Sequence, residues 1–293
     1  MAVRCGHCLP CLQHRQAEWI FRLQQEMKDG PVYFVTLTYN DQNLPVNVPD
    51  LSSDPVPTVR KKDLQEFHAK LRAIFQRGFY HDDTLVRAGF SSAPVCLSLP
   101  PDVRFTYYCT AEYGPNGNRP HYHGVYFHLP NNEDLVFDLF NHTWNKGFIT
   151  CEIGNSAACA AYTTKYLINT SFQPLPEGAD PVFSLMSKGL GKRYLESEKI
   201  CDFHRSAPAE HSFCTVEGHR TVMPRYYREK LYDDDIGKPE LQAYAQRKAD
   251  RIARERSRES REERNARIFS EIQQEKETIE QAKWRFIRNG KLK

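Results

Sequence analysis

Two neighbouring segments rich in aromatic and β-branched residues, 104–113 and 119–127, constrain this chain most, because both are predicted to be β-strands. The residues between them, 114–118, spell Gly-Pro-Asn-Gly-Asn, which is a dense turn signal. The two strands are therefore predicted to pair as an antiparallel hairpin. Residues i and i+2 of a strand point to the same face, so His121 and His123 should project side by side.

A carboxylate on the first strand could complete a metal site with these histidines. Glu112 stands near the end of that strand and can lie beside His121, near the start of the next. Two imidazoles and one carboxylate suit Mn²⁺ or another transition ion better than Mg²⁺, which stays an alternative. The competing interpretation is a surface hairpin with two incidental histidines, since short motifs also match by chance.

The alanine-rich segment 156–168 is predicted to be a helix. Tyr162 and Tyr166 are four residues apart and share one face of it, with Lys165 beside that face. Two phenols next to an ammonium could serve as nucleophiles, although a tyrosine, with a pKa of about 10, needs a nearby cation to attack at neutral pH. An amphipathic helix that buries both rings is the competing interpretation.

In this combination and order, the motifs resemble those of the HUH endonucleases, and most closely the replication initiators of gokushovirus-like microviruses. The likeness covers roughly residues 1–230 and includes the cysteine motif 5–11, the strand 34–39, and the motifs at 112–114, 119–124 and 224–227.

The resemblance implies site-specific nicking and joining of single-stranded origin DNA in the rolling-circle replication of a small phage. Glu112, His121 and His123 would hold one Mg²⁺ or Mn²⁺. Tyr162 or Tyr166 would attack the scissile phosphate, and a 5′-phosphotyrosine link and a free 3′-hydroxyl would result.

Tyr162 is favoured as the first nucleophile, because Tyr-x-x-Lys resembles the pattern of single-tyrosine relatives, and Lys165 would stabilise phosphate charge. A host polymerase would extend the 3′-hydroxyl, and a host helicase would unwind the duplex. The absence of a Gly-x-x-x-x-Gly-Lys-Ser/Thr loop agrees with chemistry that needs no ATP. The alternatives are a non-catalytic single-stranded DNA-binding module and a transposase of the same HUH chemistry.

The order of predicted elements is typical of an α+β fold, in which helices pack on one antiparallel sheet as in the RNA-recognition fold. Predicted elements are helices over 12–28, 61–76 and 131–144, and strands over 32–39 and 148–153, besides the hairpin and the tyrosine helix. The predicted domains are an N-terminal cysteine cluster and helix (1–30), an endonuclease core (31–170), an extension (171–236) and a long charged helical tail (237–293).

Cys5, Cys8 and Cys11 are spaced by three residues and could bind Zn²⁺, with His14 or a distant cysteine as fourth ligand. The chain has nine cysteines and no apolar leader, so they are expected to be reduced thiols or metal ligands. Free thiols are the competing interpretation. An iron–sulfur cluster is not expected, because Arg15 stands where a ferredoxin-type run would have its fourth cysteine.

Several residues are candidates for contacts with DNA. Thr36 and Thr38 share one face of the first predicted strand, which the resemblance places against single-stranded DNA. Arg119 belongs to the histidine motif. Lys192 and Arg193 stand in a glycine-containing basic stretch that could touch phosphates, although a plain loop is favoured there.

Charge and hydropathy bound the remaining partners. The net charge of +3 is too small to prove a nucleic-acid partner. Basic residues are concentrated in the tail, where 16 Lys or Arg face 10 Asp or Glu from residue 238 onward. The tail could add salt-sensitive phosphate contacts, although a solvated helix is favoured. No run of 18 apolar residues is present, so the protein is expected to stay off membranes, in the cytoplasm of the host bacterium.

Overall fold

The structure, a computed structural model, describes most of the chain in two compact units. The described residues are 5–6, 8–48, 54–77, 79–80, 95–96, 105–114, 118–154, 175, 177–216, 218–232 and 237–290. The sheet unit holds those between 26 and 154 and between 175 and 190, and the terminal unit holds those up to 25 and from 191 onward. The predicted tyrosine helix, with Tyr162, Lys165 and Tyr166, lies outside the described residues.

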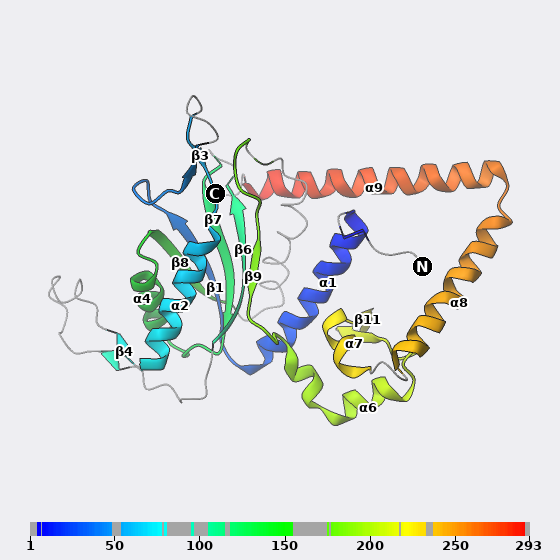
Figure 1. The fold of residues 1–293 in the computed structure, drawn as a ribbon, viewed down its shortest axis with the longest axis horizontal. Helices are drawn as coiled ribbons and strands as arrows, with labels where there is room; N and C mark the ends of the chain where they lie inside the picture. Colours follow the sequence, from blue (N-terminus) through cyan, green and yellow to red (C-terminus); the bar gives the residue numbers. More distant parts are fainter. Residues whose placement is uncertain are drawn as a thin grey trace. The chain divides into compact units, whose positions relative to one another are not determined.

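The sheet unit is built on a five-stranded antiparallel sheet in the order β8-β1-β7-β6-β9 (Figure 1). Its strands are β1 (Val32–Tyr39), β6 (Thr106–Tyr113), β7 (Pro120–Phe127), β8 (Gly147–Gly154) and β9 (Ser184–Met186). This arrangement confirms the predicted α+β class with a central antiparallel sheet. The short edge strand β9 was not predicted, because three residues are too few to show an alternating pattern.

Two helices cover one face of this sheet, α2 (Lys61–Arg77) and α4 (Glu133–Thr143) (Figure 1). Helix α2 buries Leu64, Phe67 and Leu71, whose spacing puts them on one side of a helix. Helix α4 begins at Asn132, whose side-chain oxygen accepts a hydrogen bond from the Leu135 N–H at 3.0 Å. The opposite sheet face is thereby left for polar side chains.

The core beneath these helices is dominated by aromatic rings from alternate strand positions. Tyr39 and Tyr122 are buried, and their hydroxyls hydrogen-bond to each other at 2.7 Å. Burial of a phenol is tolerated when its hydroxyl finds such a partner. The absent side chain of Gly124 matters here, because a Cβ would stand 2.6 Å from both the Cys109 sulfur and the Tyr126 ring.

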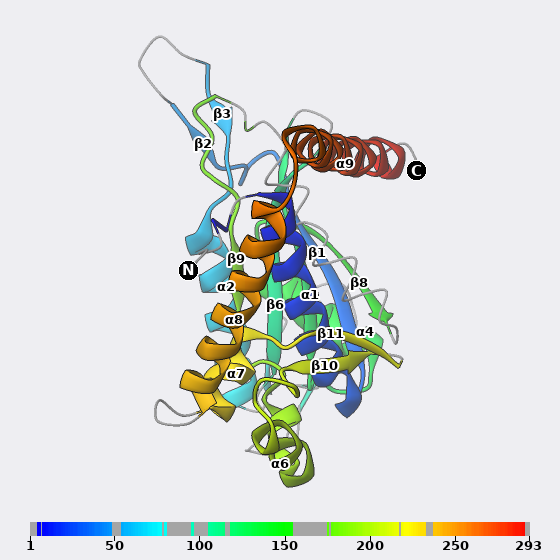
Figure 2. The same ribbon diagram turned by 90° about the vertical axis from the view of Figure 1, so that its right-hand side faces the viewer.

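Shorter elements surround the sheet. Residues 40–58, predicted to be a loop, contain a small hairpin that projects beyond the sheet (Figure 2). These elements are η1 (Met27–Asp29), β2 (Val46–Asn47) paired with β3 (Val56–Pro57), and β4 (Phe79–Tyr80) paired with β5 (Val95–Cys96).

The terminal unit has a small core of its own around Phe21, Met223, Tyr227 and Leu231. Lys192 and Arg193 open a short 3₁₀-helix there, so the favoured plain loop was wrong. Its elements ahead of the tail are α1 (Leu9–Glu26), η2 (Lys192–Glu196), α6 (Glu198–Ser206), β10 (Phe213–Val216), β11 (His219–Val222) and α7 (Arg225–Leu231).

The charged tail is two helices, α8 (Gly237–Ser257) and α9 (Arg261–Gly290), so the single long helix predicted was wrong (Figure 1). The Ser260 hydroxyl accepts from the Glu263 N–H at 3.2 Å, and the Glu263 carboxylate accepts from the Ser260 N–H at 2.8 Å. This reciprocal capping box starts a new helix and is visible in the sequence as Ser-x-x-Glu. Among the described residues, no helix is both long and apolar enough to span a membrane.

Candidate functional site

The sheet face opposite α2 and α4 carries a cluster of two histidines and a carboxylate. Strands β6 and β7 pair so that Glu112 lies opposite His121, and His123 follows on the same face. The Glu112 Oε2 atom lies 3.4 Å from the His121 Nε2 and 3.2 Å from the His123 Nε2. Three potential ligand atoms thus converge within 4.8 Å of one another. We call these residues the metal triad and the face that carries them the site face.

The hairpin turn orients the first of these histidines. The Arg119 carbonyl accepts a hydrogen bond from the Gly114 N–H at 2.9 Å, which closes the base of the turn. The same carbonyl lies 3.1 Å from the His121 Nδ1. Because a carbonyl can only accept, the His121 Nδ1 carries the proton and its Nε2 keeps a lone pair for a ligand.

The second histidine is oriented by the neighbouring strand β1. The Thr36 hydroxyl lies 3.0 Å from the His123 Nδ1, and the Phe34 ring stacks on the imidazole with centroids 5.8 Å apart. The His123 Nε2 is therefore also directed toward Glu112. Sequence reasoning assigned Thr36 to DNA contact and missed this role, since the pairing of β1 with β7 cannot be read from either strand alone.

Burial and charge set the protonation of the carboxylate. Burial by itself would raise the pKa of Glu112, but hydrogen bonds and favourable charge interactions with His121 and His123 outweigh it and lower the pKa to about 2. Glu112 is therefore an anion at neutral pH. An anion that is only 5% exposed needs compensating positive charge, which the paired histidines or a cation can supply.

The donor set fits a divalent metal ion. Two imidazole Nε2 atoms and one carboxylate oxygen suit transition ions, and both rings have their other nitrogen held, as is usual for metal ligands. Thr110 adds a further polar group, because it lies opposite His123 on β6 and its buried hydroxyl has no hydrogen-bond partner among the described residues. A hydroxyl in that position suits a water molecule bound to the ion.

The site face continues from the metal triad to the edge of the sheet. Thr38 on β1 lies opposite His121 on one side and opposite Phe148 of β8 on the other. The Phe148 side chain therefore faces the same way as the histidines, and it is 68% exposed. Phe148 was missed as a functional candidate, because its strand could be predicted from the sequence but its place in the sheet could not.

The remaining candidates for DNA contact have different surroundings. The Arg119 guanidinium donates to the Tyr39 carbonyl at 2.7 Å and to the Asp41 carboxylate at 2.8 Å, so it is already engaged. Arg193 lies 3.6 Å from Glu196 within η2, and Lys192 is exposed in the same element. Contact of Thr36, Thr38, Arg119, Lys192 or Arg193 with DNA stays a prediction.

The cysteine motif forms a second cluster, in which the sulfurs of Cys5, Cys8 and Cys11 lie together. His14 is not part of it, because its Nε2 lies 3.2 Å from the Glu18 carboxylate one helical turn further on. His14 as fourth ligand was therefore wrong.

Comparisons with known proteins agree with the motifs. Residues 32–171 match the family model of the replication-associated protein ORF2. The chain is similar to the replication-associated protein ORF2 of Spiroplasma virus 4, with 28% identity over 215 residues, covering 68% of this chain and 58% of that protein. It is also similar to the replication-associated protein VP4 of Bdellovibrio phage phiMH2K, with 23% identity over 247 residues, covering 78% and 67%.

The chain thus spans about three fifths of the length of the Spiroplasma virus protein. These matches confirm the predicted resemblance to replication proteins of microviruses. One solved structure, the N-terminal nuclease domain of non-structural protein 1 of minute virus of mice, aligns with 63% of this chain and 82% of that domain. Its 9% identity and TM-score of 0.21 are too low to support a conclusion.

Proposed function

We propose that this chain, a relative of the replication-associated proteins of microviruses, nicks and joins single-stranded DNA at the origin of a small phage genome. The observation that carries the proposal is the convergence of Glu112, His121 and His123 on one sheet face. Nicking would start rolling-circle replication, and joining would end it by closing the circle.

The metal triad would hold one Mg²⁺ or Mn²⁺. A divalent ion bound there would act as a Lewis acid that polarises the phosphorus of the scissile phosphate. The Arg119 carbonyl and the Thr36 hydroxyl hold the two imidazoles in place, so that little reorganisation is needed when a substrate arrives.

The nucleophile is proposed from the sequence, since the tyrosine helix lies outside the described residues. The phenolic oxygen of Tyr162 or Tyr166 forms a bond to phosphorus, and the bond from phosphorus to the 3′-oxygen breaks. The phenol loses its proton and the leaving 3′-oxygen gains one, so the products are a 5′-phosphotyrosine and a 3′-hydroxyl. Lys165 would stabilise the phosphate charge. The reverse reaction joins the ends without ATP.

The DNA would lie along the site face. The exposed Phe148 ring offers a stacking surface for a base, and Thr38 lies between this ring and His121. Residues 31–170 would form the nuclease core, with the cysteine segment, the extension and the tail as additions. A host polymerase and helicase would complete replication in the host cytoplasm.

A binding module without catalysis is the second candidate, favoured by the same exposed ring. A transposase would use the same chemistry. The complete metal triad argues for catalysis, because a protein that only binds DNA has no need of a carboxylate buried between two histidines.

The test is nicking of a single-stranded origin fragment with Mn²⁺ or Mg²⁺, followed by denaturing electrophoresis. A label at the 3′-end should travel with the protein, whereas a label at the 5′-end should appear on a released fragment. The covalent adduct should disappear in the double variant Tyr162→Phe with Tyr166→Phe. The loss of adduct in one single variant would identify the first nucleophile.

Tyr244→Phe is the matched control, since Tyr244 is an exposed tyrosine on α8 and should be dispensable. If the protein binds the fragment but forms no adduct with either metal, the catalytic proposal is wrong and the binding module takes its place.

A further inference from the structure

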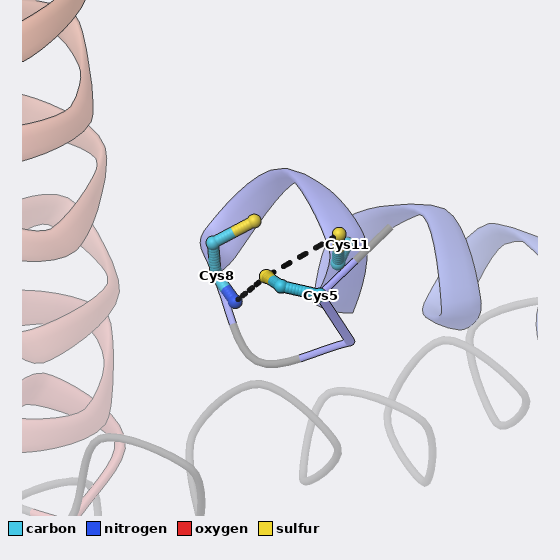
Figure 3. Close-up of side chains that lie close together, drawn as sticks. All are labelled: Cys5, Cys8 and Cys11. Carbon is cyan, nitrogen blue, oxygen red and sulfur yellow. Dashed lines mark hydrogen bonds between the residues drawn. The ribbon is translucent and has the colours of Figure 1, made fainter. Parts of the chain in front are cut away.

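The sulfurs of Cys5, Cys8 and Cys11, here called the thiol cluster, point into one shared space at the start of α1 (Figure 3). The Cys5 and Cys11 sulfurs are 3.9 Å apart. A disulfide would require about 2.05 Å. Two thiolates on one tetrahedral zinc, each with a Zn–S bond of about 2.3 Å, are about 3.8 Å apart. The observed separation matches the zinc geometry and not a disulfide.

We propose that the thiol cluster binds one structural Zn²⁺, with three thiolate ligands and one corner of the tetrahedron left for a further ligand. This inference does not rest on the proposed nicking activity.

The surroundings of the cluster support a metal site more than a set of idle thiols. Free cysteines are among the most buried residue types, and Cys109, Cys201 and Cys214 of this chain follow that rule. Cys5 and Cys8 instead lie exposed at the surface, next to each other and to Cys11. Exposed thiols gathered in this way bury no core, so packing does not explain their position.

The local backbone also suits thiolate ligands. The Cys8 N–H donates to the Cys5 sulfur at 3.3 Å, and such outer contacts are typical of metal-bound sulfur. Helix α1 has no acidic residue in its first turn, so its N-terminus lacks the negative charge that stabilises a helix start. A zinc ion with three thiolates would carry a net negative charge there.

The other cysteine–histidine group of the terminal unit does not compete for this role. The His204 Nδ1 lies 2.7 Å from the His211 carbonyl, and its Nε2 lies 2.8 Å from the Tyr194 hydroxyl. The Cys201 sulfur donates to the Leu195 carbonyl at 3.3 Å. These contacts fit a buried structural network.

The proposed ion would fasten the start of the chain to α1. That helix contributes Phe21 to the core of the terminal unit, where its ring meets those of Tyr194 and Tyr227. A chelator that removes the ion should therefore loosen α1 and the packing around Phe21.

The experiment measures zinc in the full-length protein by mass spectrometry after dialysis against a weak chelator. One zinc per chain is expected, and Cys8→Ser and Cys11→Ser should lose it. Cys151→Ser is the matched control, because Cys151 lies on β8 outside the cluster. The double variant His121→Ala with His123→Ala should keep the zinc, which separates this site from the metal triad.

Cobalt replacement gives a second readout that does not depend on variants that might misfold. Co²⁺ added to the chelated wild-type protein should produce sulfur-to-cobalt charge-transfer absorption, and added Zn²⁺ should abolish it. Absence of that absorption, or equal zinc contents in Cys8→Ser, Cys11→Ser and wild type, would overturn the proposal. Three freely titrating thiols in freshly purified protein, or a Cys5–Cys11 disulfide, would do the same.

Discussion

Each histidine of the metal triad uses one ring nitrogen for positioning and keeps the other for a ligand. The Arg119 carbonyl holds His121 and the Thr36 hydroxyl holds His123. Two groups of different origin, a turn carbonyl and a side chain of the next strand, thus fix two rings toward one carboxylate. The cost of orienting them is met during folding, before any ligand binds.

Replacement of Thr36 by valine should weaken metal binding. The change keeps the shape of the side chain but removes the partner of the His123 Nδ1, so affinity for Mn²⁺ should fall about 10- to 100-fold. Titration calorimetry measures the effect, and Thr36→Ser should restore the affinity. Thr38→Val is the control on the same strand face; if it weakens binding as much as Thr36→Val does, the orienting role of Thr36 is wrong.

His68 makes stability depend on pH. Burial, with a smaller effect from Arg72, lowers the pKa of this histidine to about 3, against about 6.5 in the unfolded chain. Between these values the unfolded state binds more protons, so this contribution is complete above pH 6.5 and is lost as the pH falls toward 3. At pH 5 the loss should be about 2 kcal/mol.

The substitution His68→Gln should remove this pH dependence, because glutamine does not titrate and can still meet the Tyr126 hydroxyl, which lies 3.0 Å from the His68 Nε2. Denaturant unfolding at pH 7 and pH 5 gives the comparison. His142→Gln, at an exposed position of α4, should leave the difference between the two pH values intact. Equal losses in wild type and His68→Gln would contradict the prediction.

At the scale of elements, the order of strands joins distant segments into one surface. Strand β1 lies between β7 and β8, so it connects the metal triad to Phe148 through Thr38. The helices cover the other face, and the site face is consequently the one on which a nucleic acid strand can lie.

Removal of the Phe148 ring should weaken binding of single-stranded DNA by about 1–3 kcal/mol, the typical value of one stacked base. Fluorescence anisotropy with a labelled origin fragment measures Phe148→Ala against wild type. Phe137→Ala is the control, since Phe137 is an exposed phenylalanine on α4, which packs on the opposite sheet face. If both variants bind as wild type does, Phe148 is not a stacking site.

At the scale of the whole molecule, positive charge is unevenly distributed along the sequence. The tail carries an excess of Lys and Arg, whereas the net charge of the chain is only +3. Some tail arginines are engaged, as Arg267 is with Glu259 and Glu271 at 3.0 Å each. Tail arginines that form no ion pair among the described residues are the candidates for phosphate contacts.

Substitution of Arg254, Arg258, Arg261 and Arg264 by glutamine should reduce the salt dependence of DNA binding. Each lost phosphate contact lowers the slope of log K against log salt by about 0.7 for single strands, so four lost contacts give about 3. Binding isotherms at several salt concentrations test this. Arg267→Gln should leave the slope unchanged; an unchanged slope in the fourfold variant would favour a solvated tail.

The sequence by itself determined the local elements and the metal ligands. Strand β1 begins and ends where its alternating pattern predicts, and α2 does so within one residue. The turn at 114–118 set the register that places Glu112 opposite His121. These features depend on neighbours in sequence, where strand period, helix period and turn residues act directly.

Only the tertiary structure decided which distant segments meet. The pairing of β1 with β7 and β8 gave His123 its threonine and placed Phe148 in line with the metal triad. The partner of His14 likewise came from helix geometry, which turned it to Glu18 and away from the cysteines. Strand order depends on burial summed over the whole core, and no single segment of sequence encodes that sum.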